Sequence, residues 1–337
     1  MQTKIIEPTH SAFSHPLLIK YLLNTPLIYS PTQTIVYRDQ KVITYTQFGT
    51  RICQLAHALN TLGIQAGNTV AVMDWDSNRY LECYFAVPMI GAILHTVNVR
   101  LSSEQLLYTI NHAEDDVILI NSEFLPLLEA IKDKLSTVKK IVLLTDSEQS
   151  TPTSLVIDHE YEAMLQENPE EYSFQDFDEN SIATTFYTTG TTGLPKGVYV
   201  SHRQLVLHTY SIMGALCGYD GQARVSSSDV YMPITPMFHV HAWGMPYLMT
   251  LLGAKQVYPG RYEPEKLLQT ITKEKVTFSH CVPTIMHMLL SSPLIDDCNL
   301  AGWKVIIGGS ALSSGMCKAA LTKGINIYTC LLYTSDA

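Results

Sequence analysis

The chain has 337 residues, of which 46% are hydrophobic and 16% charged, so it is long and apolar enough for a globular protein with a substantial core rather than a disordered one. Its formal net charge of −9, without any Lys/Arg-rich run, excludes nucleic acid as an expected partner. The seven cysteines lack a C-x-x-C pair, which predicts a cytoplasmic protein without structural zinc, and the absence of a long apolar stretch predicts no transmembrane helix.

The first half of the chain alternates between strand and helix patterns. Residues 34–45 are predicted to form a hairpin, after which the capping-box pair Thr44 and Gln47 opens a helix that ends at Gly63. Further elements are expected at residues 69–73, 79–91, 92–97, 102–112, 117–120, 124–135 and 141–144. The polar, acidic segment 146–180 is expected to be a mobile connection. This βαβ alternation predicts an α/β fold with mostly parallel sheets and helices on their faces.

The same alternation continues in the second half. Ser201 is predicted to cap a helix that runs to Thr209, and residues 229–234 are predicted to form a strand. The remaining expected elements lie at residues 248–252, 255–258, 264–272, 276–281, 284–290 and 305–307.

A glycine- and threonine-rich segment, residues 187–197 (YTTGTTGLPKG), lies between two predicted strands. Its glycines allow positive φ and close approach of backbone N–H groups to a ligand, and its threonine hydroxyls can donate hydrogen bonds or bind Mg²⁺. Lys196 adds a compact positive charge for phosphate oxygens. The spacing excludes both G-x-x-x-x-G-K-[ST] and G-x-G-x-x-G. The segment therefore predicts a polyphosphate cradle of a different kind.

This cradle resembles the signature T-[ST]-G-T-T-G-x-P-K-G of the adenylate-forming enzymes, which include acyl-CoA synthetases, luciferases and peptide-synthetase adenylation domains. The resemblance implies a large N-terminal adenylation domain of stacked αβαβα layers that uses ATP, Mg²⁺ and CoA. It also implies that Lys196 is catalytic and neutralises the phosphates, and that Thr188 is a Mg²⁺ ligand. The nucleotide-binding residues that it implies are Thr188, Thr189, Gly190, Thr191, Thr192, Gly193, Lys196, Val240 and Gly309.

A second cluster of chemically active side chains occupies residues 236–247 (PMFHVHAWGMPY). A metal site at His239 and His241 has little support, because no carboxylate or cysteine lies at matching spacing. An aromatic helix start packed into the core remains an open alternative. The cluster also resembles the medium- and long-chain fatty acyl-CoA synthetase branch, which implies that His239 is a catalytic residue beside the acyl carboxylate and phosphate. The same resemblance implies that Trp243 gates the acyl tunnel, as an indole can at an apolar channel mouth.

A third feature, Gly308-Gly309, directly follows a predicted strand. Such a pair suits a ligand lying against the backbone at the end of a parallel strand, although glycine pairs more often only turn the chain. The family resemblance makes Gly309 a contact for adenine and the acyl group.

The resemblance covers residues 34–329. After residue 329 the family pattern predicts a further G-Y-G-x-T-E motif. This chain instead reads CLLYTSDA at 330–337, eight residues that we expect to be non-native. Residues 1–329 are accordingly expected to be an incomplete N-terminal adenylation domain without the small C-terminal domain.

The expected activity of the parent enzyme is ATP-dependent conversion of a medium- or long-chain fatty acid to acyl-adenylate and then acyl-CoA, with this fragment impaired. Two alternatives remain open: adenylation of an aryl or other carboxylic acid, and an inactive fragment that only binds nucleotide. The expected partners are small molecules, and both peripheral membrane contact and a homodimer are left open.

Overall fold

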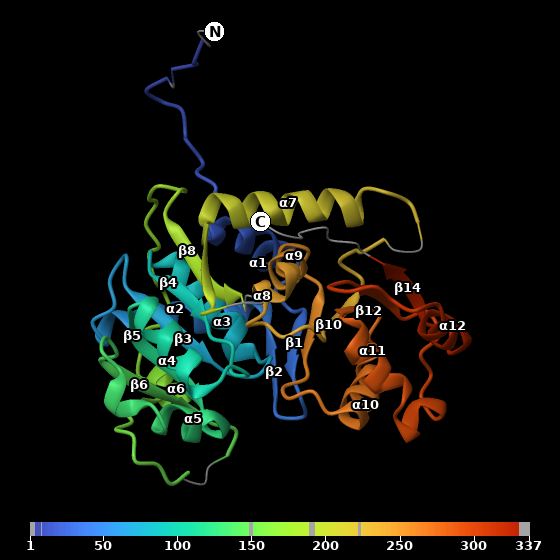
Figure 1. Ribbon diagram of the computed structural model, residues 1–337. Coiled ribbons are helices and arrows are strands. Elements are labelled where there is room, and N and C mark those ends of the chain that lie inside the picture. Colours follow the sequence, from blue (N-terminus) through green and yellow to red (C-terminus); the bar gives the residue numbers. More distant parts are fainter. Residues whose placement is uncertain (1–3, 8, 148–150, 189–192, 222–223, 330–337) are drawn as a thin grey trace.

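The computed structural model describes residues 4–7, 9–147, 151–188, 193–221 and 224–329. Four residues of the predicted cradle, Thr189, Gly190, Thr191 and Thr192, lie outside the described residues, as does the expected non-native tail 330–337. Within the described part, the chain forms two seven-stranded sheets with helices packed around them (Figure 1). The expected α/β fold is confirmed.

The first sheet has the strand order β7-β6-β5-β3-β4-β8-β9. Its members are β3 (Thr69–Met73), β4 (Ile93–Thr96), β5 (Asp115–Asn121), β6 (Lys140–Leu144), β7 (His159–Glu160), β8 (Ile182–Thr188) and β9 (Lys196–Ser201). Neighbouring strands are parallel except for the antiparallel pair β8–β9. Every residue of β3 is buried, as expected for a parallel strand covered on both faces.

The second sheet has the order β14-β13-β12-β10-β11-β1-β2. Its members are β1 (Thr34–Tyr37), β2 (Lys41–Thr44), β10 (Val230–Pro233), β11 (Lys255–Tyr258), β12 (Phe278–Cys281), β13 (Lys304–Ile307) and β14 (Asn326–Thr329). The antiparallel hairpin β1–β2 joins this sheet because β1 pairs in parallel with β11. The start of the chain therefore completes a sheet that is otherwise built from its last third.

Helices follow most of the predicted positions. They are α1 (Asn24–Tyr29), α2 (Tyr45–Thr61), α3 (Asn78–Met89), α4 (Ser103–His112), α5 (Leu125–Glu129), α6 (Tyr161–Gln166), α7 (His202–Cys217), α8 (Val240–Trp243), α9 (Met245–Leu251), α10 (Pro264–Glu274), α11 (Pro283–Leu290) and α12 (Ser314–Thr322). Short 3₁₀ turns are η1 (Ile19–Leu23), η2 (Ser122–Phe124), η3 (Lys132–Lys134) and η4 (Pro293–Asp296). The capping boxes at Thr44 and Ser102 are present. No helix in the described ranges is long and apolar enough to cross a membrane.

Three predicted elements were wrong in part. The segment 146–180 contains β7 and α6, because Tyr161, Met164 and Leu165 recur at helical spacing and are buried despite the acidic residues around them. The helix expected at 124–135 is only the short α5 flanked by η2 and η3, and the helix expected to end at Thr209 runs on to Cys217.

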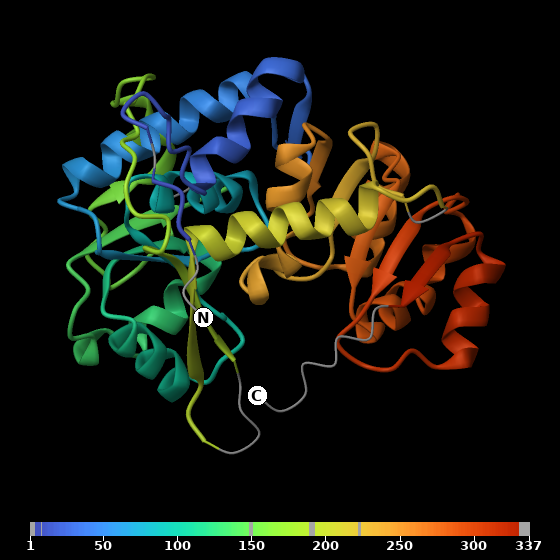
Figure 2. The same cartoon turned by 90° about the horizontal axis from the view of Figure 1, so that it is seen from above.

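Helix α7 lies across both halves of the molecule (Figures 1 and 2). Its first turns bury Leu205 and Val206 in the core shared with β3, β4 and α3. Its last turns place Ile212, Met213 and Leu216 against the core around Tyr231 and Leu248. Side chains on one helix therefore reach the space between the two sheets.

Candidate functional site

The described ends of the predicted cradle form an antiparallel ribbon. Thr188 closes β8 and Lys196 opens β9, and the two residues are direct cross-strand partners. Both are exposed, and Lys196 has no ion-pair partner among the described residues. Gly193 has φ of 125°, a conformation that favours glycine, as expected for such a loop. A hydroxyl and an ammonium group thus face solvent side by side, which fits a phosphate group with Mg²⁺.

A cavity of about 760 Å³ lies beside this ribbon, between α7, the residues around α8 and the turn after β13. Its walls are Phe186, Val198, Tyr199, Val200, Gln204, Leu205, His208, His239, Val240, His241, Trp243, Gly244 and Gly309. Four residues predicted from two separate motifs, His239, Val240, Trp243 and Gly309, therefore meet in one place. Gly193, Thr188 and Lys196 do not line it. The structure separates the predicted residues into a phosphate ribbon and an adjoining cavity.

The backbone of α8 is left-handed. Val240, His241, Ala242 and Trp243 have φ between 48° and 58°, and Gly244 follows at 73°. L-residues adopt this conformation at a cost of roughly 1–2 kcal/mol each, so the surrounding protein must hold it. His208 on α7 does so in part: its Nε2 lies 3.2 Å from the Trp243 carbonyl, and a Cβ at Gly244 would lie 2.7 Å from its ring. An aromatic helix start was one alternative left open for this segment; the structure has this left-handed turn first, and the ordinary helix α9 begins only at Met245.

The residues before this turn are tied to the first sheet. Asp76 accepts a hydrogen bond from the Met237 N–H at 2.9 Å, while the Tyr84 hydroxyl donates to the Met237 carbonyl at 2.5 Å. The Thr96 hydroxyl donates to the Phe238 carbonyl at 3.2 Å. His239 therefore follows a backbone segment whose polar groups form hydrogen bonds with three side chains from different parts of the chain.

Three histidines at or beside the cavity, His239, His241 and His280, have lowered pKa values that favour the neutral form. Desolvation, with a smaller contribution from the positive charge of Arg100, lowers the pKa of His239. Burial lowers the pKa of His241 to about 3, and the same effect lowers that of His280 to about 3. The His280 ring packs against Trp243, with 5.0 Å between ring centroids. With Phe186, Val198, Val200 and Leu205 as neighbours, the cavity suits an apolar chain that carries a polar head.

The contribution of α7 to this cavity was not predicted from the sequence. Gln204, Leu205 and His208 lie on one helical face and line the cavity, a spacing that could have been recognised once the helix after the cradle was extended. Arg100 was not predicted as a neighbour of this site either; its guanidinium lies 5.7 Å from the ring centroid of Phe238.

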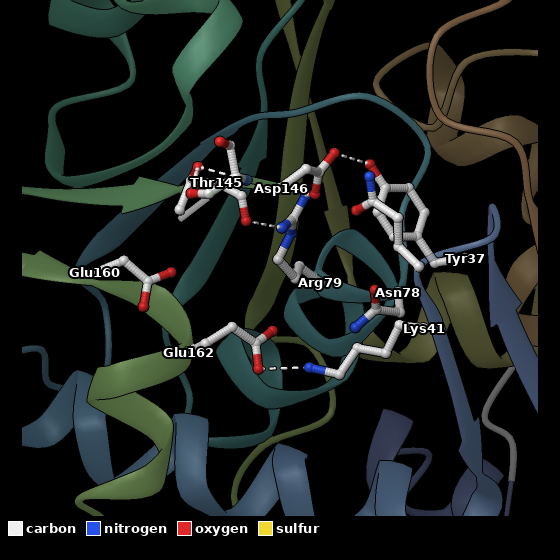
Figure 3. Close-up of a pocket in the computed structure, with 10 residues that line it drawn as sticks. Tyr37, Lys41, Asn78, Arg79, Thr145, Asp146, Glu160 and Glu162 are labelled. Carbon is white, nitrogen blue, oxygen red and sulfur yellow. Dashed lines mark hydrogen bonds and ion pairs between the residues drawn. The ribbon is translucent and has the colours of Figure 1, made fainter. Parts of the chain in front are cut away.

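A second cavity, of about 430 Å³, lies between the β1–β2 hairpin and the ends of β6 and β7 (Figure 3). Four of its charged groups form two ion pairs: Lys41 pairs with Glu162 at 2.5 Å, and Arg79 pairs with Asp146 at 2.8 Å. The Tyr37 hydroxyl donates to Asp146 at 2.6 Å. No residue predicted from the sequence lies in this cavity, so its chemistry is separate from that of the predicted motifs.

In the described residues, no group of three or more His, Cys, Asp or Glu side chains could hold a metal ion. Thr188 offers a hydroxyl oxygen of the kind that could bind Mg²⁺ together with oxygens of a nucleotide.

The chain is similar to known proteins in its family profile, in its sequence and in its fold. The sequence profile of a family described as "AMP-binding enzyme" matches residues 29–332. A long-chain-fatty-acid–CoA ligase of Thermus thermophilus is 44% identical over 243 residues, which is 72% of this chain and 42% of that protein. A 3-methylmercaptopropionyl-CoA ligase of Ruegeria lacuscaerulensis is 36% identical over 310 residues, 90% of this chain and 56% of that protein. The chain thus spans about half the length of these relatives.

The architecture is also found among solved structures. The N-terminal domain of FACL13 from Mycobacterium tuberculosis superposes with a TM-score of 0.79 at 21% identity, covering 93% of this chain and 75% of that one. This likeness confirms the expected fold of the N-terminal domain of acyl-CoA synthetases.

Proposed function

Because the chain belongs to the AMP-binding enzyme family, we propose that it binds ATP and activates a medium- or long-chain fatty acid as part of an AMP-forming acid–CoA ligase. The meeting of His239, Val240, Trp243 and Gly309 around one largely apolar cavity, next to the Thr188–Lys196 ribbon, carries this proposal. A phosphate-binding ribbon beside an apolar cavity suits a reaction between a nucleoside triphosphate and a fatty acid.

In the proposed reaction, a carboxylate oxygen bonds to the α-phosphorus of ATP while the bond from that phosphorus to the pyrophosphate oxygen breaks. The thiol sulfur of CoA then bonds to the acyl carbon, AMP leaves with the electron pair of the broken bond, and the thiol proton is released. Bound Mg²⁺ would supply charge neutralisation on the phosphates. Binding geometry and charge stabilisation therefore carry the catalysis.

Each candidate residue has a role that its position supports. Lys196 is exposed and free among the described residues to meet β- or γ-phosphate oxygens, and Thr188 across the ribbon offers its hydroxyl. His239 lies where the cavity wall begins its left-handed turn and orients the acid against the α-phosphate. Trp243 lies farther along the same wall and limits the acyl chain.

Pyrophosphate exchange tests this function. The purified chain is incubated with ATP·Mg²⁺, labelled pyrophosphate and one acid at a time: octanoate, palmitate, 3-methylmercaptopropionate or benzoate. We expect exchange with octanoate or palmitate to exceed exchange with the other two acids. Higher exchange with benzoate would instead support an aryl-acid ligase.

A calorimetric titration with ATP·Mg²⁺ separates the remaining alternative. Nucleotide binding without exchange for any acid would indicate an inactive nucleotide-binding chain. Absence of both binding and exchange would overturn the proposed function.

A further inference from the structure

Tyr187 lies directly before Thr188 and faces the opposite side of β8 from Phe186. Phe186 lines the cavity and packs against His241, with 5.2 Å between ring centroids. Successive strand residues point to opposite faces, so Tyr187 turns towards β4 and α4 instead. It is 7% exposed, and its ring centroid lies 5.2 Å from that of His95 on β4. The two neighbouring aromatic side chains therefore pack on opposite faces of β8, Phe186 at the cavity and Tyr187 against His95.

The ring of Tyr187 covers Gly197, its direct partner across the ribbon. A Cβ at Gly197 would lie 3.3 Å from two ring carbons of Tyr187, tighter than an ordinary contact, although the φ of Gly197 is not in the left-handed region. The close approach of the Tyr187 ring, rather than the backbone conformation, thus favours glycine at this position. An aromatic ring over a cross-strand glycine compensates for the missing side chain in the ribbon.

The hydroxyl of Tyr187 is held by the end of helix α4. His112, the last residue of that helix, places its Nδ1 2.8 Å from the hydroxyl oxygen. Burial, reinforced by the nearby Tyr199 and Asp115, raises the pKa of Tyr187, so the hydroxyl keeps its proton at neutral pH. The hydroxyl of Tyr187 is therefore held by His112, in addition to the contact of its ring with Gly197.

A buried pair of side chains, His95 and Asp115, also supports the ring of Tyr187. The Nδ1 of His95 lies 2.8 Å from one carboxylate oxygen of Asp115 and 3.1 Å from the other. Both side chains are almost fully buried, which fixes the plane of the His95 ring. Asp115 begins β5, three residues after His112, so one helix-to-strand connection carries both supports.

We propose that Tyr187, held by His112 and by the His95–Asp115 pair, is a positioning residue that sets the spacing between Thr188 and Lys196. The identity of the ligand, the triphosphate of ATP, rests on the proposed function. The pairing of β8 with β4 extends to Thr185, whereas its pairing with β9 continues to Thr188. A two-stranded ribbon is only marginally stable by itself, so without this support the ends of β8 and β9 would not hold a single geometry. Tyr187 need not touch the nucleotide for this role.

The test compares two ligands in the same chain: ATP·Mg²⁺ by calorimetry, and decanoate by calorimetry as a probe of the cavity. The variants are His112→Ala, His112→Gln, Gly197→Ala and Phe186→Ala. We expect His112→Ala and Gly197→Ala to weaken ATP binding about tenfold and leave decanoate binding within twofold. His112→Gln, whose amide can still bond the tyrosine hydroxyl, should restore most of the ATP affinity. Phe186→Ala should show the reverse split, with weaker decanoate binding and unchanged ATP binding.

Unchanged ATP affinity in both His112→Ala and Gly197→Ala overturns the inference. An equal loss of both ligands, with a lower melting temperature, also overturns it, because that pattern indicates general destabilisation.

Hydrogen exchange distinguishes this inference from the proposed function. In the absence of ligand, the backbone amides of Thr188 and Lys196 should exchange faster in His112→Ala than in the wild type. Faster exchange supports the positioning role even in a chain that binds no ATP, and such a chain would overturn only the proposed function. Unchanged exchange counts against the positioning role whatever the nucleotide does.

Discussion

Asp76 and Met237 connect the two sheets directly ahead of the left-handed turn. Asp76 follows β3 of one sheet, and its carboxylate accepts the Met237 N–H at 2.9 Å. The hydroxyl of Tyr262, after β11 of the other sheet, donates to the same carboxylate. Burial raises the pKa of Asp76 to about 7, although both hydrogen bonds oppose the shift. The cavity wall that carries His239 is therefore anchored on a carboxyl group that titrates near neutrality.

This pKa predicts how stability depends on pH. An unfolded aspartate titrates near pH 3.9, so the folded protein binds the extra proton between about pH 4 and pH 7. The stabilisation from protonated Asp76 is present below pH 4 and is lost as the pH rises through 7. Asp76→Asn keeps an acceptor for Met237 and does not titrate. Its free energy of unfolding, relative to the wild type, should rise by on the order of 3 kcal/mol from pH 5 to pH 8.5.

Urea denaturation across this pH range measures the difference. Asp76→Ala is the control, because it leaves the Met237 N–H without its partner and should be less stable than Asp76→Asn at every pH. Parallel pH curves for Asp76→Asn and the wild type would contradict the raised pKa.

Trp243 is predicted to limit the acyl chain. Trp243→Ala would enlarge the cavity beside His280, against which the indole packs at 5.0 Å. Longer acids should then gain affinity relative to octanoate, up to about 0.8 kcal/mol for each newly buried methylene. Titrations with acids of about 8 to about 16 carbons measure the change in binding affinity for each added methylene. Trp243→Phe should give a smaller shift, and an unchanged chain-length order in Trp243→Ala would refute the limiting role.

Lys196 is predicted to bind phosphate and to contribute little to folding. It is exposed and has no ion-pair partner among the described residues, so Lys196→Met should leave the melting temperature unchanged. Loss of a charged hydrogen-bond donor should weaken ATP binding by about 1.5–3 kcal/mol, roughly tenfold or more. Lys196→Arg keeps the charge and should retain part of the affinity. Equal ATP affinity in Lys196→Met and the wild type would remove Lys196 from the site.

Arg51 and Glu82 form a largely buried ion pair on which the stability of the fold is predicted to depend strongly. The Arg51 Nε lies 2.7 Å from one oxygen of Glu82, which is fully buried and also accepts the Tyr161 hydroxyl at 2.6 Å. Arg51→Met leaves this carboxylate without its main countercharge and should destabilise the fold by about 3–5 kcal/mol. Chemical denaturation of Arg51→Met, Glu82→Leu and their double variant measures the pair. A double variant no more stable than either single variant would contradict the expected coupling.

Much of the fold could be predicted because local patterns agreed with it. The strand Thr69–Met73 was predicted with the bounds that the structure has, since its continuous apolar run fits a parallel strand buried on both faces. The capping box at Thr44 and the cap at Ser201 placed two helix starts correctly. Helix α6 was missed because its buried residues Tyr161, Met164 and Leu165 are a short pattern within an acidic segment, and their burial depends on partners such as Glu82.

The sequence by itself determined the chemistry of this protein: the glycines, threonines and lysine of the cradle, the histidine and indole of the second motif, and the family to which they point. These features are local, because a turn or a cap depends on neighbours in the chain. Tertiary structure alone decided that α7 lines the cavity, that residues 240–244 turn left-handed, and that Tyr187 covers Gly197 beside His112. These relationships join residues from separate elements, and packing and burial rather than local preference select them.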